Sequence, residues 1–187
     1  VKMVNRFGEE GVAHTVWSNL IEFIHGYRNQ HLSSPLEYQK NHFVSNSEAG
    51  EGLMRLFPLP SPHNHAWYYS WLELPQFPFL KSREAYEQFF YRQRIETILE
   101  NIRRHKPKIV LMYGMNNINA LKSSVEAFFT VANFKMVKAV KQQIPQHHRA
   151  DIDDTTLQIS AQIPALRHNR LESGFDWSAF GRAVSPY

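Results

Sequence analysis

The sequence contains no cysteine, which excludes disulfide bonds and metal sites built from thiolates. It also lacks a long apolar run: the longest uninterrupted one, Ile109–Tyr113, is far too short to cross a membrane. Neither a Gly-x-x-x-x-Gly-Lys phosphate loop nor a Gly-x-Ser-x-Gly nucleophile motif occurs, so nothing supports an NTPase or a serine hydrolase. We therefore expect a soluble protein of the reducing cytoplasm that has no membrane partner.

The composition is that of a globular domain. Of the 187 residues, 43% are hydrophobic and 13% are aromatic, which is enough to build one buried core. The formal net charge is +4, and the basic residues gather in three clusters at 103–108, 135–149 and 167–170. Each cluster alone is compatible with a solvated face, but three of them on one small domain favour a nucleic acid as the partner.

Hydrophobic periodicity predicts alternating helices and strands. Helical spacing of apolar residues occurs over 11–25, 82–105, 118–129 and 175–184, and strands are expected at 53–59, 108–114 and 155–161. The polar stretch 29–52 is expected to be loop with a short helix at most. Helix, apolar strand, helix and strand in succession are typical of a βαβ unit, and the fully apolar 108–114 indicates a strand buried on both faces.

Ligands of such sheets bind at the loops that follow the carboxyl ends of the strands. Here these loops are 58–67, 114–117 and 162–170, and all three are polar or restrained by proline. The sequence therefore predicts a binding site where these loops meet.

In this order and on this framework, the loops resemble those of the uracil-DNA glycosylase superfamily. The segment Ile109–Asn116 looks like that family's third strand and the glycine-containing phosphate loop after it. Ser160–Arg167 is similar to the last motif, in which a strand runs into a loop that enters the minor groove. Gly52–Leu59 lies where the second strand is expected. The resemblance extends over residues 50–185.

The resemblance implies one domain over residues 1–187, folded as a three-layer α/β/α sandwich around a central, mostly parallel four-stranded sheet. Lys108–Tyr113 is expected to be a central strand. The family's first strand and first motif, which carries the water-activating Asp or Asn, are not found in the sequence and are expected to precede residue 1.

The function that the resemblance implies is base excision by a DNA glycosylase. Such a hydrolase binds DNA, flips one base out of the stack and cleaves its N-glycosidic bond, and it needs no cofactor. The catalytic His of the last motif is Gln162 here, with His168 close by as a substitute. An amide recognises a base but cannot carry positive charge, so the expected target is a modified base rather than uracil.

The catalytic candidates are therefore Gln162 and His168. Hydroxyl, amide and guanidinium groups of the three loops, together with backbone amides near a helix N-terminus, are suited to phosphate and groove contacts. The nucleic-acid-binding candidates are Ser61, His63, Gly114, Met115, Asn116, Asn117, Arg167, Asn169 and Arg170.

Two other functions stay open. The first is a non-catalytic nucleic-acid-binding or interaction module on the same scaffold, which the missing first motif and Gln162 favour. The second is a metal-dependent hydrolase, because side chains of metal-ligand type occur in two groups, although their spacing matches no known motif. These groups are His63-x-His65 and Asp151-x-Asp153–Asp154 with His147 and His148.

Overall fold

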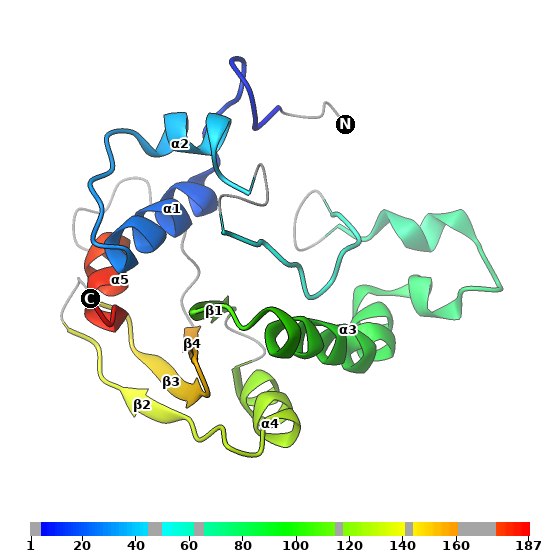
Figure 1. Cartoon of the computed structure of the whole chain (residues 1–187). Helices are drawn as coiled ribbons and strands as arrows, with labels where there is room; N and C mark the ends of the chain where they lie inside the picture. Colours follow the sequence, from blue (N-terminus) through cyan, green and yellow to red (C-terminus); the bar gives the residue numbers. More distant parts are fainter. Residues whose placement is uncertain (1–4, 45–49, 62–65, 115–117, 141–143, 161–174) are drawn as a thin grey trace.

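The computed structural model describes residues 5–44, 50–61, 66–114, 118–140, 144–160 and 175–187 (Figure 1). Its elements, in chain order, are α1 (Thr15–Tyr27), α2 (Pro35–Asn41), the 3₁₀ helices η2 (Tyr68–Leu72) and η3 (Pro78–Lys81), α3 (Arg83–His105), β1 (Ile109–Tyr113), α4 (Ile118–Phe128), β2 (Lys135–Val137), β3 (His147–Ile152), β4 (Thr155–Ser160) and α5 (Trp177–Val184). The predicted α/β class is confirmed, and the four predicted helices correspond to α1, α3, α4 and α5.

The described strands form one mixed four-stranded sheet in the order β1-β4-β3-β2. β1 pairs with β4 in parallel, whereas β4 with β3 and β3 with β2 are antiparallel. The prediction of a mostly parallel sheet is therefore wrong. The physical reason is the short turn at Asp153 and Asp154, which joins β3 directly to β4 and so makes the two strands run in opposite directions.

β1 is the outermost described strand on one side of the sheet, so the prediction that Lys108–Tyr113 is a central strand is also wrong. Its apolar run has another cause. Ile109 and Leu111 pack against the core cluster of α1 and α5, whereas Val110 and Met112 pack against the cluster that includes α3 and α4. Figure 1 shows these two pairs of helices on opposite sides of the strands. Both faces of β1 are thus covered, although the strand is not central.

α3 is a long amphipathic helix with defined ends. The Ser82 Oγ caps it by accepting a hydrogen bond from the Ala85 N–H (3.1 Å), and Lys106 ends it in the left-handed conformation. Its 23 residues span about 34 Å, against about 17 Å for the five residues of β1. Because only a short link joins them, the N-terminal half of α3 extends beyond the end of β1. Neither α3 nor any other described helix combines the length and apolarity needed to span a bilayer.

α1 and α5 cross at two glycines. A Cβ added to Gly26 of α1 would lie 2.1 Å from the Ser178 carbonyl oxygen, and one added to Gly181 of α5 would lie 2.1 Å from the Phe23 carbonyl oxygen. The two backbones therefore touch directly, which requires glycine at both positions. This crossing fixes α5 on the face of the sheet that α1 covers.

The stretch Leu53–Leu59 is not a strand, contrary to the prediction. Side chains of α3 satisfy its backbone in place of a neighbouring strand. Arg94 donates from Nη2 to the Arg55 carbonyl (2.8 Å) and from Nε to the Leu56 carbonyl (3.2 Å). The Leu59 N–H donates to the Tyr86 hydroxyl (3.3 Å). The segment therefore follows α3 and not the sheet.

Candidate functional site

The two parallel strands end side by side. Tyr113 of β1 is in register with Ser160 of β4, and the Gly114 N–H donates a hydrogen bond to the Ser160 carbonyl (3.2 Å). The chain leaves both strands here, at the place where open α/β sheets bind their ligands. We call Tyr113, Gly114 and Ser160 the carboxyl edge.

Gly114 gives this edge an open backbone. Its φ of 144° lies in a region that other residues rarely adopt, so glycine is required by conformation. Apart from its chain neighbours, no described residue places a heavy atom within 4 Å of the position that a Cβ would take, so no described side chain crowds the main chain at this point.

Tyr113 places a phenol at the edge. Its ring packs against the core cluster of α1, where Leu20, Ile21 and Phe43 are buried. Burial raises the pKa of Tyr113, and the positive charge of Arg55 acts in the opposite direction, so the phenol is neutral at pH 7. Its hydroxyl forms no hydrogen bond with a described residue.

His14 precedes α1 and caps it. Its Nδ1 accepts a hydrogen bond from the Trp17 N–H (3.3 Å), and its ring stacks on the Trp17 indole with centroids 4.7 Å apart. Partial burial lowers the pKa of His14, and the positive charges of Arg6 and Arg55 lower it further. The imidazole is thus neutral, in surroundings whose charge is positive.

Arg55 supplies the positive charge that His14 and Tyr113 share. Its backbone is held by Arg94, but its own side chain is exposed, and the guanidinium forms no hydrogen bond or ion pair with a described residue. Arg6 differs, because its Nη1 donates to the carbonyls of Val12 (3.3 Å) and Ala13 (2.8 Å). The site is therefore electropositive and suited to an anion.

Of the residues predicted from the sequence, Gly114 lies at this edge. Ser61 lies elsewhere, near the N-terminus of α3, where its hydroxyl donates to the Ala66 carbonyl and accepts from Arg83 Nη2 (2.8 Å). The other candidates lie outside the described residues and stay predictions: His63, Met115, Asn116, Asn117, Gln162, Arg167, His168, Asn169 and Arg170. The segments that hold all of these except His63 begin directly after Gly114 and Ser160, at the carboxyl edge.

Sequence reasoning missed Arg55, Tyr113 and His14 as site residues. Two of them carried a signal. Arg55 is the single charged residue of the apolar stretch 53–59, and Tyr113 is the last residue of the apolar run before a glycine. His14 carried none, because the charge of Arg55 acts on it only through the tertiary packing of the chain.

A metal centre has no support in the described residues, where no three His, Asp or Glu side chains converge. Asp151 instead accepts hydrogen bonds from Thr156 Oγ1 (2.8 Å) and Arg149 Nη2 (3.2 Å). Burial raises the Asp151 pKa, but these hydrogen bonds and the positive charges of Arg149 and Lys135 outweigh it, so the pKa is lowered overall. The carboxylate therefore belongs to the hairpin surface.

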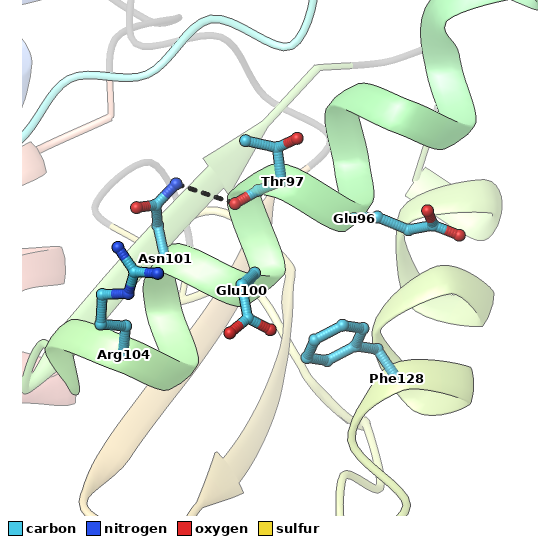
Figure 2. Close-up of a pocket in the computed structure, with 6 residues that line it drawn as sticks. All are labelled: Glu96, Thr97, Glu100, Asn101, Arg104 and Phe128. Atoms are coloured by element: carbon cyan, nitrogen blue, oxygen red, sulfur yellow. Dashed lines mark hydrogen bonds between the residues drawn. The ribbon is translucent and has the colours of Figure 1, made fainter.

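A groove of about 560 Å³ lies between α3 and Phe128 of α4. Figure 2 shows the residues that line it. Most of its polar groups bond within α3: Asn101 Nδ2 donates to the Thr97 carbonyl (2.8 Å), and Glu100 Oε2 pairs with Arg103 (2.6 Å). Glu96 pairs with Arg92 (2.9 Å). The groove is therefore a surface feature of the helix pair, and the carboxyl edge is the better candidate site.

No family model, curated protein or solved structure matches this chain.

Proposed function

We propose that this chain binds DNA across the carboxyl edge and acts there on a single base, as a DNA glycosylase-like protein with a three-layer α/β/α arrangement. The observation that carries the proposal is the hydrogen bond between Gly114 and Ser160. It brings together the starting points of the phosphate loop and the minor-groove loop that the resemblance implies.

The charge around the edge supports the same proposal. The ionised groups that act on Tyr113 and His14 are arginines, and one of them, Arg55, has no ionic partner among the described residues. Neutralising phosphates with arginine releases counterions, so we expect binding that weakens steeply as salt is added.

Base release from duplex DNA tests the enzymatic part. We expect abasic sites on a duplex that carries a modified pyrimidine, with weak or absent activity on uracil, because Gln162 recognises a base without stabilising its negative charge. Gln162→Ala should lower the single-turnover rate more than tenfold (on the order of 10²–10³ for loss of a stabilising donor) and leave DNA affinity nearly constant. If Gln162→Ala excises the base as fast as the wild type, His168 is the catalytic residue instead.

A non-catalytic DNA-binding module is the second candidate. The positive surroundings of the carboxyl edge favour it, because they suit a phosphate whether or not a bond is cleaved. The two functions separate cleanly in one experiment: salt-sensitive DNA binding without abasic sites across a panel of modified duplexes assigns the module and rejects the glycosylase.

A further inference from the structure

We propose that the outer edge of β2 binds an extended, acidic segment of a partner protein, which adds to the sheet as a further strand. We call Lys135, Met136, Val137 and Lys138 the β2 edge. β2 ends the sheet on the side away from β1, and among the described residues it pairs only with β3 (Figure 1). None of these residues belongs to the carboxyl edge, so the inference goes beyond the proposed function and does not depend on it.

The hydrogen bonds of β4 show which way its main-chain groups point. The Thr156 N–H donates to the Lys108 carbonyl (3.0 Å), and the Ser160 carbonyl accepts from the Gly114 N–H (3.2 Å). Along a strand, the N–H and C=O groups of successive residues point alternately to the two neighbouring strands. Alternate residues of β4, from Thr156 to Ser160, therefore point to β1, and the residues between them point to β3.

The same alternation continues into β3. Ile159 lies between two of the residues that point to β1, so its main-chain groups point to β3. It is in register with His148, which therefore points back to β4. His147 and Arg149, on either side of His148, then point to β2.

In β2 this pattern leaves the main chain of Met136 unpaired. Lys135 is in register with Arg149, and Val137 with His147, so these two residues of β2 bond to β3. Met136, between them, directs its N–H and C=O away from the sheet, and neither group bonds to a described residue. An edge strand with open main-chain groups can pair with an extended chain.

The side chains of the β2 edge are exposed and differ between the two faces of the sheet. Met136, which is 54% exposed, is in register with His148 and, beyond it, with Ile159 of the core cluster of α3 and α4. It therefore lies on that face, whereas Lys135 and Val137 lie on the opposite one. A strand bound here would meet an apolar thioether on one face and a lysine on the other.

The charge of the β2 edge favours an acidic strand. Neither Lys135 nor Lys138 forms an ion pair with a described residue. The carboxylates nearby are already engaged: Asp151 accepts from Arg149 Nη2 (3.2 Å), and Glu126 Oε1 accepts from the main-chain N–H just before β2 (3.5 Å). Opposite charges on neighbouring strands attract and like charges repel, so glutamates of an added strand would pair with these lysines.

The same lysines disfavour a second copy of this chain as the occupant. Two β2 strands side by side would bring Lys135 and Lys138 of one copy close to those of the other. Lysine on an edge strand is a known means by which proteins prevent pairing with their own kind. The partner that fits is therefore a different chain with the opposite charge.

Main-chain chemistry favours a peptide over a nucleic acid at this edge. Met136 offers an acceptor as well as a donor, and an added strand matches both with its own N–H and C=O. The phosphates of a nucleic acid only accept hydrogen bonds, so they would meet the lysines and the Met136 N–H but leave the Met136 carbonyl unmatched.

The first test titrates the full chain with a labelled, end-capped peptide of alternating glutamate and valine, followed by fluorescence anisotropy. Met136→Pro removes the outward N–H, and it keeps the bonds of Lys135 and Val137 to β3, because proline is tolerated where the N–H of an edge strand faces solvent. We expect this variant to bind the peptide more than tenfold more weakly. Met136→Leu is the matched control, which keeps the N–H and an apolar side chain, and it should bind like the wild type.

The second test exchanges the charges and leaves the main chain intact, so it decides the matter even if Met136→Pro lowers the melting temperature. Lys135→Glu combined with Lys138→Glu should weaken binding of the glutamate peptide more than tenfold. The same double variant should gain binding of an alternating lysine and valine peptide, which the wild type does not bind.

A folded Met136→Pro variant that binds the glutamate peptide as tightly as the wild type would overturn the proposal. If duplex DNA also displaces the peptide in that case, the lysines form a surface for nucleic acid instead. A wild-type chain that does not bind the glutamate peptide at low salt, or a double variant without the exchanged preference, would equally reject an acidic strand at the β2 edge.

Discussion

Gln158 is a fully buried residue of β4 whose amide nitrogen and oxygen have no hydrogen-bond partner among the described residues. Leu157 and Ile159 face the core cluster of α3 and α4, so Gln158 points to the other face of the sheet. An unsatisfied buried polar group costs about 1–3 kcal/mol, which makes this position a weak point of the fold.

We expect Gln158→Met to raise the free energy of unfolding by about 1 kcal/mol or more, because it keeps the length of the side chain and removes both unpaired atoms. Urea denaturation measures the change. Gln39→Met is the control, since Gln39 is equally buried but bonds to the carbonyls of Arg6 (2.7 Å) and Val12 (3.0 Å) and to the His14 N–H (2.9 Å). The control should lose stability. A loss of stability in Gln158→Met as well would contradict the prediction and indicate that the Gln158 amide has a hydrogen-bond partner outside the described residues.

At the level of elements, two effects oppose each other when a glycine at the crossing of α1 and α5 is replaced by alanine: helix propensity favours the change, and steric collision disfavours it. Replacing a glycine inside a helix with alanine normally stabilises it by about 1 kcal/mol. At Gly26 and Gly181 the added methyl would instead collide with a carbonyl of the facing helix, 2.1 Å away in each case. Backbone cannot move aside as a side chain can, so the helices must separate.

We therefore expect Gly26→Ala and Gly181→Ala each to lower the free energy of unfolding by about 1–3 kcal/mol, the usual cost of overpacking. Gly52→Ala is the control, because, apart from its chain neighbours, no described residue has a heavy atom within 4 Å of its added Cβ. Denaturant titration of all three variants decides the matter, and a neutral or stabilising result at both helix positions would refute the close crossing.

The elements that could be predicted from the sequence are those with a long or uniform pattern. α3 shows helical spacing over 23 residues and a serine cap, and β1 is apolar throughout. β2 and β3 were missed because β2 has three residues and β3 reads as a basic cluster, His147–Arg149. The signal available in the sequence was the turn-forming pair Asp153–Asp154 between two short segments. In the structure Asp153 adopts a left-handed φ of 47° there.

Some residues of the candidate site could likewise be predicted from local sequence, whereas others depend on contacts between distant parts of the chain. Tyr113 and Gly114 follow from local sequence, since a strand that ends in glycine can be read directly. The place of Arg55 cannot, because it depends on hydrogen bonds from Arg94, which lies 39 positions away. The false strand at 53–59 has the same origin: its apolar residues suit a strand, but a distant arginine satisfies the backbone.

For the molecule as a whole, one buried histidine, His147, and two partly buried ones, His14 and His148, couple stability to pH. The pKa of His147 is lowered, and burial is the largest cause. The positive charges of His148 and Arg149 lower this pKa further, whereas the hydrogen bond to the Pro145 carbonyl raises it. Burial also lowers the pKa of His14 and His148. The unfolded chain therefore binds protons more readily than the folded one just below the ordinary histidine value of about 6.5.

It follows that the free energy of unfolding is highest above that value and decreases as the pH falls through about 6.5 toward the lowered folded pKa values. Denaturation at pH 8 and pH 6 should show this decrease. His147→Gln should reduce it and keep the part that comes from His14 and His148. A wild-type stability that rises on acidification over this interval would be incompatible with three neutral, partly buried imidazoles.

The pairing of β1 with β4 also determines when the carboxyl edge comes into existence. The β3–β4 hairpin closes across two residues and can form early, whereas β1 meets β4 only after the intervening chain, 114–154, has been brought round. Closing such a long loop costs entropy before any contact compensates for it, which makes the parallel pair a slow step of folding. During synthesis, the apolar side chains of β1 leave the ribosome well before their partner strand. The site would then be among the last parts of the molecule to assemble, and ligand binding would report on completed folding.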